Sequence, residues 1–326
     1  MTTDGYIFIK RLVNPDAVIA LRRKMLSVIQ AGGWIADGTD PLDGIADISR
    51  KCGENDIGYT DVYHEVYKLQ EFHEAGHWKP VLDTMRKLID GPVFPHPLKI
   101  ARIWFPKYTD HTTPAHQDYV HNQGSFDTYT CWIPVGACPI ELGGLAVVPG
   151  SPETSKVLDH HFSLGAGGMA ADVPGQDSEW HTTDYEPGDA LIFHSLTAHK
   201  ALPNTTENRL RVSLDNRYQS IHDPITEGLL KPHLNKLDPD GKDNGPLTWE
   251  EVYADWTTDE LQYYWKDRQG PVIAKDQTYS DRALQEAFEL ARQGDSGARL
   301  RLDRLRRRDP LSENGIAAAA LLDGSQ

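Results

Sequence analysis

Apolar residues recur at helical spacing in the N-terminal part of the chain. The clearest stripe runs from Val18 to Ile29, between Asn14-Pro15 and Gly32-Gly33. Asparagine is a good N-cap, proline is favoured at the first helical position, and glycine commonly ends a helix. The pattern predicts a strand over residues 5–13, a helix from Pro15 to about residue 31, and helices over residues 59–72 and 80–89.

The pattern changes to short apolar runs from about residue 96. We expect strands over residues 98–105, 128–135, 145–148, 190–193 and 210–214. Turn sequences such as Gly143-Gly144 and Pro187-Gly188-Asp189 separate these runs. Many short strands with glycine and proline turns indicate an all-β sandwich or barrel as the core.

The strand pattern fades after about residue 222, and helical patterns return. We expect helices over residues 249–256, 259–265 and 281–308. The chain therefore reads as a mostly β core with flanking helices in residues 1–222. Residues 223–326 form a C-terminal helical extension, packed on or beside that core.

Charge and composition narrow the partners. The net charge of -15 argues against a nucleic-acid-binding surface, which needs clustered lysine and arginine. We interpret the one basic run, Arg299–Arg308, as the solvated face of a helix. Neither a signal peptide nor a run long enough to span a bilayer is apparent, so we expect a cytoplasmic protein without membrane contact.

Histidine is the metal ligand in best supply. The chain has three scattered cysteines and 14 histidines, so a cysteine zinc site or a disulfide framework is not indicated. The tripeptide His116-Gln117-Asp118 places an imidazole and a carboxylate two residues apart. On a strand both would point to one face, as two ligands of an Fe(II) facial triad. Alone, the pair could equally be a surface His-Asp pair.

A third ligand has to come from a distant segment, and residues 186–204 carry two candidates. His194 directly continues an apolar strand, which favours packing. His199 lies past that strand, where a loop could aim it into a barrel mouth. His111 and His121 flank the tripeptide and are candidates for the entrance. The Gly-rich insertion at residues 163–184, with Trp180-His181, could be a substrate lid or an ordinary surface loop.

These features fall into one order along the chain. The ordered set is His116-Gln117-Asp118, Trp132, Gly143-Gly144-Leu145, Pro149-Gly150-Ser151, Gly188-Asp189, Phe193-His194, His199 and Asn204. Together with the opening GYIFIKRLVNPDAVIALR, it resembles the phytanoyl-CoA dioxygenase (PhyH) family of Fe(II)- and 2-oxoglutarate-dependent oxygenases, over about residues 5–220. The resemblance implies a double-stranded β-helix, a jelly-roll or cupin-like barrel, in agreement with the strand pattern.

The resemblance also implies a ligand set. His116 and Asp118 match the metal pair and His199 matches the distal histidine, so these three are the expected catalytic and metal residues. An arginine should grip the remote carboxylate of 2-oxoglutarate. We favour Arg211, because a second arginine followed by tyrosine stands six residues later. Arg209 remains the rival.

Two further residues belong to the expected co-substrate site. Trp132 matches a family position near 2-oxoglutarate, although an aromatic residue there could equally be plain core. Thr130 shares its strand face and could donate a hydroxyl hydrogen bond. Fe(II), 2-oxoglutarate and O2 are the implied cofactor and co-substrates.

The expected activity is oxidation of a small-molecule C–H bond with release of succinate and CO2. Related halogenases lack the carboxylate that Asp118 provides here, so hydroxylation is expected, with desaturation, cyclisation or epoxidation as alternatives. The competing hypothesis is a cupin-like barrel without metal or keto-acid, either a binding protein or an isomerase. The helical C-terminal region could also join two copies as a homo-oligomer. The sequence does not identify the substrate.

Overall fold

The ten-residue strand β10 (Arg211–Ser220) organises the main sheet of this computed structural model, which describes residues 1–109, 112–151, 156–174 and 179–324. The strand order is β1-β8-β4-β10-β2, with β3 also paired to β10 and every pairing antiparallel. The other strands of this sheet are β1 (Tyr6–Ile9), β2 (Val93–Pro95), β3 (Ile100–Trp104), β4 (Tyr129–Pro134) and β8 (Ala190–His194).

A smaller layer faces this sheet across the interior. It contains the antiparallel pair β5 (Leu145–Val147) and β9 (His199–Ala201). Leu145 and Ala201 pack in one apolar cluster with Trp132 and Phe193 of the main sheet. Two facing antiparallel layers agree with the expected jelly-roll core, and the active-site residues described below lie between them.

Helices cover the outer face of the main sheet. They are α1 (Pro15–Ala31), α2 (Tyr59–Tyr67), α3 (Gln70–Ala75) and α4 (Lys79–Ile89). Val212 and Leu214 of β10 pack in the apolar cluster of α1–α3, and Tyr218 packs in the cluster of α4. Successive residues of a strand point to opposite faces, so the intervening polar residues of β10 turn inward.

The predicted helix start and end at α1 are confirmed. The Asn14 side chain accepts a hydrogen bond from the Asp16 N–H, Pro15 occupies the first turn, and Gly32 follows the last residue. The predicted strands also form, with the run at residues 210–214 extending to Ser220. The predicted helix over residues 59–72 is instead divided into α2 and α3.

The expected helix over residues 259–265 is wrong. Only a 3-10 turn, Tyr264–Asp267, forms there, after Tyr263 with a φ of 56°. A residue in this left-handed conformation interrupts an α-helix. Trp265, just after it, packs into the main apolar cluster. The expected helix over residues 281–308 is two helices, α7 (Thr278–Arg292) and α8 (Ser296–Arg308), because Gly294 has a φ of 92° and Asp295 caps the second helix.

The remaining elements are short. They are α5 (Asp118–Asn122), β6 (His160–Phe162), β7 (Met169–Ala171), β11 (Ile225–Thr226), β12 (Asn235–Leu237), β13 (Asp243–Pro246), α6 (Trp249–Tyr253), β14 (Val272–Ile273), α9 (Glu313–Leu322) and the 3-10 turns Pro41–Asp43, Ile48–Arg50, Ile140–Leu142 and Glu227–Leu230.

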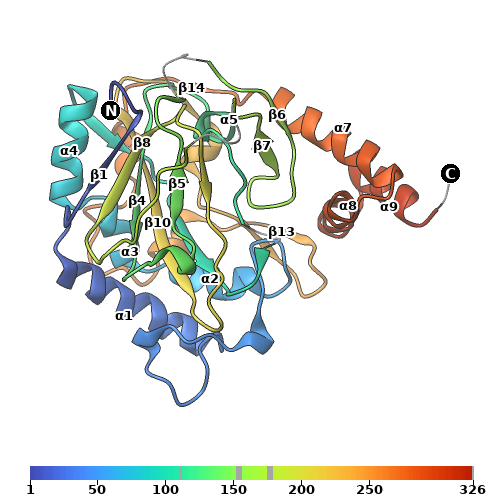
Figure 1. Ribbon diagram of the computed structural model, residues 1–326, viewed down its shortest axis with the longest axis horizontal. Helices are drawn as coiled ribbons and strands as arrows, with labels where there is room; N and C mark the ends of the chain where they lie inside the picture. The colour runs from blue at the N-terminus through green and yellow to red at the C-terminus, as the bar shows by residue number, and fades with distance from the viewer. Residues whose placement is uncertain (110–111, 152–155, 175–178, 325–326) are drawn as a thin grey trace.

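Residues 223–326 contain two structurally different parts. Leu229, Val252 and Trp265 belong to the same apolar cluster as α1–α3. Helices α7–α9 instead form their own cluster with β6 and β7, at one side of the molecule, as Figure 1 shows. The first part is therefore continuous with the central core, and the helices α7–α9 are its lateral extension.

The basic run Arg299–Arg308 lies on α8 and differs from the solvated face we expected. Arg304 is only 7% exposed and pairs with Asp56, and Arg308 donates to the Asn55 side chain. These contacts join α8 to the loop before α2. Among the described residues, no helix has the length and apolar character that crossing a membrane requires.

Candidate active site

His116 and His199 face each other through a single antiparallel bridge. The His116 N–H donates to the His199 carbonyl at 2.9 Å, and the His199 N–H donates back at 3.0 Å. Each imidazole Nδ1 lies within 2.9 Å of a carbonyl oxygen, that of Pro114 for His116 and that of Thr197 for His199. Because a carbonyl only accepts, both Nδ1 atoms carry the proton and both Nε2 lone pairs are free for a metal.

Asp118 reaches the same point from a helix. We expected the tripeptide on one strand, but only His116 has a strand-like bridge, and Asp118 is the first residue of α5. The Gln117 side chain holds this turn by donating to the Leu196 carbonyl and accepting from the Leu158 N–H. The carboxylate Oδ1 nevertheless lies 3.6 Å from the His116 Nε2 and 4.0 Å from the His199 Nε2.

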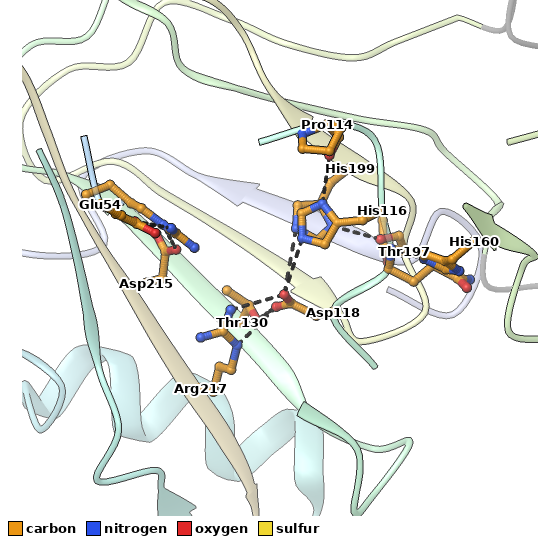
Figure 2. A network of polar contacts seen from close by, with 12 residues as sticks. Glu54, Pro114, His116, Asp118, Thr130, His160, Thr197, His199, Asp215 and Arg217 are labelled. Carbon is orange, nitrogen blue, oxygen red and sulfur yellow. Dashed lines mark hydrogen bonds and ion pairs between the residues drawn. The ribbon is translucent and has the colours of Figure 1, made fainter. Parts of the chain in front are cut away.

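The three side chains fit an iron ion. Their ligand atoms all lie within 4.8 Å of one another, and all three residues are buried. Two imidazoles and one carboxylate are the donor set of the facial triad of non-haem Fe(II) oxygenases. Figure 2 shows the side chains of His116, Asp118 and His199 converging on one point.

The Asp118 carboxylate is held by two neighbours. The Thr130 hydroxyl donates to Oδ2 at 2.5 Å, and Arg217 donates to both oxygens, at 3.0 and 3.2 Å (Figure 2). Burial by itself would raise the pKa of Asp118, but Arg217 and the two histidines hold it well below its usual value. Burial also lowers the pKa of His199 to about 3. At neutral pH the site therefore has an ionised carboxylate and a neutral His199, the forms that bind metals.

A narrow cavity leads from the triad along the inside of β10 to Arg211. Arg211 is 1% exposed, its guanidinium lies 4.5 Å from the Trp104 ring, and Nη1 donates to the Ser213 hydroxyl at 3.0 Å. Its Nε has no acceptor, and no ion pair involves its guanidinium, among the residues that the structure describes. A buried cation without an anion is costly, so this end of the cavity fits a ligand carboxylate.

The rival Arg209 does not line this cavity. It precedes β10, it is half-buried, and its carbonyl accepts a hydrogen bond from the Asn204 amide. The structure thus places Arg211 at the site and leaves Arg209 outside it.

Thr130 and Trp132 are alternate residues of β4 and both line the cavity. Thr130 contacts the ligand Asp118. The Trp132 ring packs edge-on against Tyr185 with 4.8 Å between centroids, and its Nε1 is buried without an acceptor in the described part of the chain. The indole therefore forms an aromatic wall with one donor available.

A larger cavity, of about 310 Å³, opens on the other side of the triad. It shares His116, Asp118 and Arg217 with the narrow cavity, and His121 lines it as we expected. Apolar parts of the wall come from Leu98, Ile100 and Leu229 and from Ala166 and Gly167 of the insertion. The other lining residues are Glu54, Arg102, Thr113, Asn122, Thr226, Gly228, His233 and Lys275.

Three earlier candidates lie elsewhere. Trp180 and His181 do not line the larger cavity: the His181 ring bonds the Tyr6 hydroxyl, and Trp180 packs with Lys200. Of the described residues of the insertion, Ala166 and Gly167 line it. His194 ends β8 beside Asp127. His111 lies outside the described residues.

Sequence reasoning did not assign Ser213, Arg217 and Lys275. The first two had a readable signal, since the polar residues 211, 213, 215 and 217 alternate with residues that pack outward on β10. Lys275 had none, because only the folded chain brings residue 275 to the triad.

Comparisons with known proteins agree with this site. The family described as phytanoyl-CoA dioxygenase (PhyH) matches residues 1–212 of the 326. The chain is 27% identical over 230 residues to a 1-deoxypentalenic acid 11-beta-hydroxylase of Streptomyces exfoliatus, covering 66% of this chain and 77% of that protein. The same-named protein of Streptomyces arenae is 25% identical over 232 residues, with the same coverage of both chains.

A solved structure shares the fold. The epimerase SnoN, in complex with Fe3+, alpha ketoglutarate and nogalamycin RO, superposes with a TM-score of 0.51 at 17% identity, over 76% of this chain and 93% of that one. The family match includes the three metal-ligand candidates and the strands up to the start of β10. This protein therefore belongs to the phytanoyl-CoA dioxygenase (PhyH) family, and it is a non-haem Fe(II)- and 2-oxoglutarate-dependent dioxygenase.

Proposed function

We propose that the protein hydroxylates a C–H bond of a small molecule at an iron held by His116, Asp118 and His199. One observation carries this proposal. Three buried ligand atoms within 4.8 Å of one another lie between a narrow cavity that ends at Arg211 and a wider one of about 310 Å³. The two cavities are suited to a co-substrate and a substrate, respectively. The hydroxylase names of the two Streptomyces relatives support hydroxylation over the alternative oxidations.

Arg211 and Ser213 would hold the remote carboxylate of 2-oxoglutarate. The guanidinium is fixed by stacking on Trp104 and by its bond to Ser213. Its free Nε and the Ser213 hydroxyl offer hydrogen bonds to a carboxylate, and arginine provides the planar donor pair that carboxylates prefer. Trp132 would form the side wall.

Bound iron and 2-oxoglutarate supply the oxidising chemistry, in which O2 and the keto-acid yield succinate, CO2 and an oxidised substrate. The protein residues orient and insulate this chemistry. Thr130 donates to Oδ2 of Asp118 and Arg217 donates to both oxygens, which fixes the carboxylate with Oδ1 near the two histidines. A single carboxylate ligand leaves more of the metal open to co-substrates. The apolar side chains of Leu98, Ile100 and Leu229 limit water in the wider cavity.

The first test is anaerobic addition of Fe(II) and 2-oxoglutarate to the purified protein. We expect the weak visible charge-transfer band of the chelated keto-acid, and its loss in Asp118→Ala. If the band is absent from the wild type, or if Asp118→Ala binds iron unchanged, the proposed site is wrong.

The second test compares two arginines. We expect Arg211→Ala to raise the half-saturating 2-oxoglutarate concentration about 30-fold or more, because truncating one partner of a buried charge pair costs roughly 2–5 kcal/mol. Arg209→Ala, outside the cavity, is the matched control and should change it less than about threefold. An unchanged requirement in Arg211→Ala would favour a barrel enzyme that uses no keto-acid.

A further inference from the structure

The charged side chains of the larger cavity are paired with one exception. Arg102 pairs with Glu54 at 2.6 Å and with Asp215 at 3.1 Å, and Figure 2 labels both acids. Arg217 pairs with Asp118 at 3.0 Å. Both acids and both arginines that line the cavity therefore already have partners.

Lys275 is the exception. It lines the cavity and is half-buried, and burial lowers the pKa of its ammonium group. Among the residues that the structure describes, no ion pair or hydrogen bond involves this ammonium group. Withdrawing a charge from water without a partner is unfavourable, so the position favours an anion from outside the chain.

The position of Lys275 is set by the segment that carries Asp118. Gln123 follows α5, and its buried side chain both accepts from the Asp276 N–H at 2.7 Å and donates to the Asp276 carbonyl at 2.8 Å. The Thr226 hydroxyl donates to the Asn122 carbonyl at 2.7 Å. Two segments of the C-terminal part are thus bonded to the end of α5, a short helix that begins at a metal-ligand candidate.

One part of the cavity wall is apolar. Leu98, Ile100 and Leu229 form it, together with Ala166 of the insertion, whereas the polar residues Thr113, His121, Asn122, Thr226 and His233 line other parts. Gly167 closes over His121 so tightly that a Cβ there would lie 2.8 Å from the imidazole ring. Lys275 is therefore a cation without an ion-pair partner among the described residues, in a cavity that also has an apolar side.

We propose that the substrate is a hydrophobic carboxylic acid whose carboxylate binds Lys275, while its apolar body lies along Leu98, Ile100 and Leu229 toward the metal site. This inference rests on the proposed function and adds the substrate class. A single ammonium group matches one carboxylate, whereas a polyphosphate such as coenzyme A would need several cations. Lys275 lies beyond the residues that the family match covers, so it would be a specificity residue of this chain.

The test uses pairs of probes that differ only in charge. Cyclohexanecarboxylic, adamantane-1-carboxylic and decanoic acid are each compared with the corresponding primary amide. Each probe is titrated anaerobically into the full-length protein with Fe(II) and saturating 2-oxoglutarate, and the shift of the visible band reports binding beside the metal. A probe that instead displaces 2-oxoglutarate abolishes the band, which distinguishes the two cavities.

Three variants accompany the wild type. Lys275→Met keeps the apolar stem and removes the charge, Lys275→Arg keeps the charge, and Lys242→Ala removes an exposed lysine of the same C-terminal part. We expect at least one acid to bind the wild type at least tenfold more tightly than its amide. Lys275→Met should abolish that preference and leave amide binding and the 2-oxoglutarate band unchanged. Lys275→Arg should retain most of the preference, and Lys242→Ala all of it.

Three results would overturn the inference: no acid binds the wild type, acid and amide bind equally, or Lys275→Met keeps the preference. A wild-type protein without the 2-oxoglutarate band is a different failure, since it removes the proposed function and the inference with it.

Discussion

At the scale of single residues, the iron site depends on the partners of its ligands. Carbonyl groups fix the tautomers of His116 and His199, so both rings are oriented before a metal binds. Asp118 is oriented by Thr130 and Arg217. The Arg217 guanidinium also contributes charge, since it is the main group that holds the pKa of the carboxyl down against the effect of burial.

We predict that Arg217→Gln weakens Fe(II) binding about 10- to 100-fold, the usual effect of losing an outer partner of a metal ligand. The pKa of Asp118 should rise in this variant, so iron binding should begin to fail at a higher pH as the solution is acidified. Competition with a chromogenic chelator between pH 5 and 8 measures both effects. Arg209→Gln is the control, and equal iron affinity in the two variants would contradict the role assigned to Arg217.

At the scale of elements, β10 connects the two sides of the barrel wall. Val212 and Leu214 face the outer helices. Arg211 lines the narrow cavity, and Ser213, on the same face of the strand, accepts a hydrogen bond from Arg211. The strand pairs with β4 on one side and with β2 and β3 on the other, which holds its register. A one-residue slip would exchange the two faces, so the proposed anchor for 2-oxoglutarate depends on the packing of the helices outside the sheet.

We predict that Ser213→Ala raises the dissociation constant of 2-oxoglutarate about fivefold, because Arg211 loses one hydrogen bond worth roughly 1 kcal/mol. The anaerobic visible band measures this constant without turnover. Ser220→Ala, at the far end of the same strand, should leave it unchanged. A wild-type constant for Ser213→Ala would mean that stacking on Trp104 alone orients the guanidinium.

At the scale of the whole molecule, buried histidines outside the metal site couple folding to pH. The His73 Nε2–H donates to the Tyr67 carbonyl, and burial, together with the nearby Lys99 charge, lowers the pKa of His73 to about 3. Burial also lowers the pKa of His96 to about 3, although the hydrogen bond between its ring and the Gln219 side chain acts to raise that pKa. Below about pH 6.5 the unfolded chain binds protons that the folded one does not, so stability present above that pH is lost as pH falls toward 3.

We predict that His96→Gln lessens this acid lability. Glutamine can still donate to Gln219 but does not titrate, so one proton fewer is taken up on unfolding. The slope of the unfolding free energy between pH 6.5 and 4.5 should fall by about 1.4 kcal/mol per pH unit. Urea titrations of the metal-free protein measure the slope, with exposed His222→Gln as control. The same slope in wild type and His96→Gln would show that His96 is already protonated in the fold.

Several local features of this protein follow from its sequence alone. The cap and apolar stripe of α1, the inward and outward alternation of β10, and the order of the candidates His116, Asp118 and His199 are all readable along the chain. The first two depend on residues a few positions apart, whose relation follows from the geometry of one helix or strand. The assignment of His199 came from the ordered resemblance to the family. An iron site could be predicted from the sequence because few residue types bind iron.

Only the tertiary structure decided which side chains meet. It placed Arg211 in the cavity and Arg209 outside, and it brought Lys275 to the triad through the side chain of Gln123. It also replaced the helix expected at residues 259–265 with a turn, since packing Trp265 into the core outweighs local helical preference. These outcomes depend on contacts between residues distant in sequence, which no local periodicity encodes.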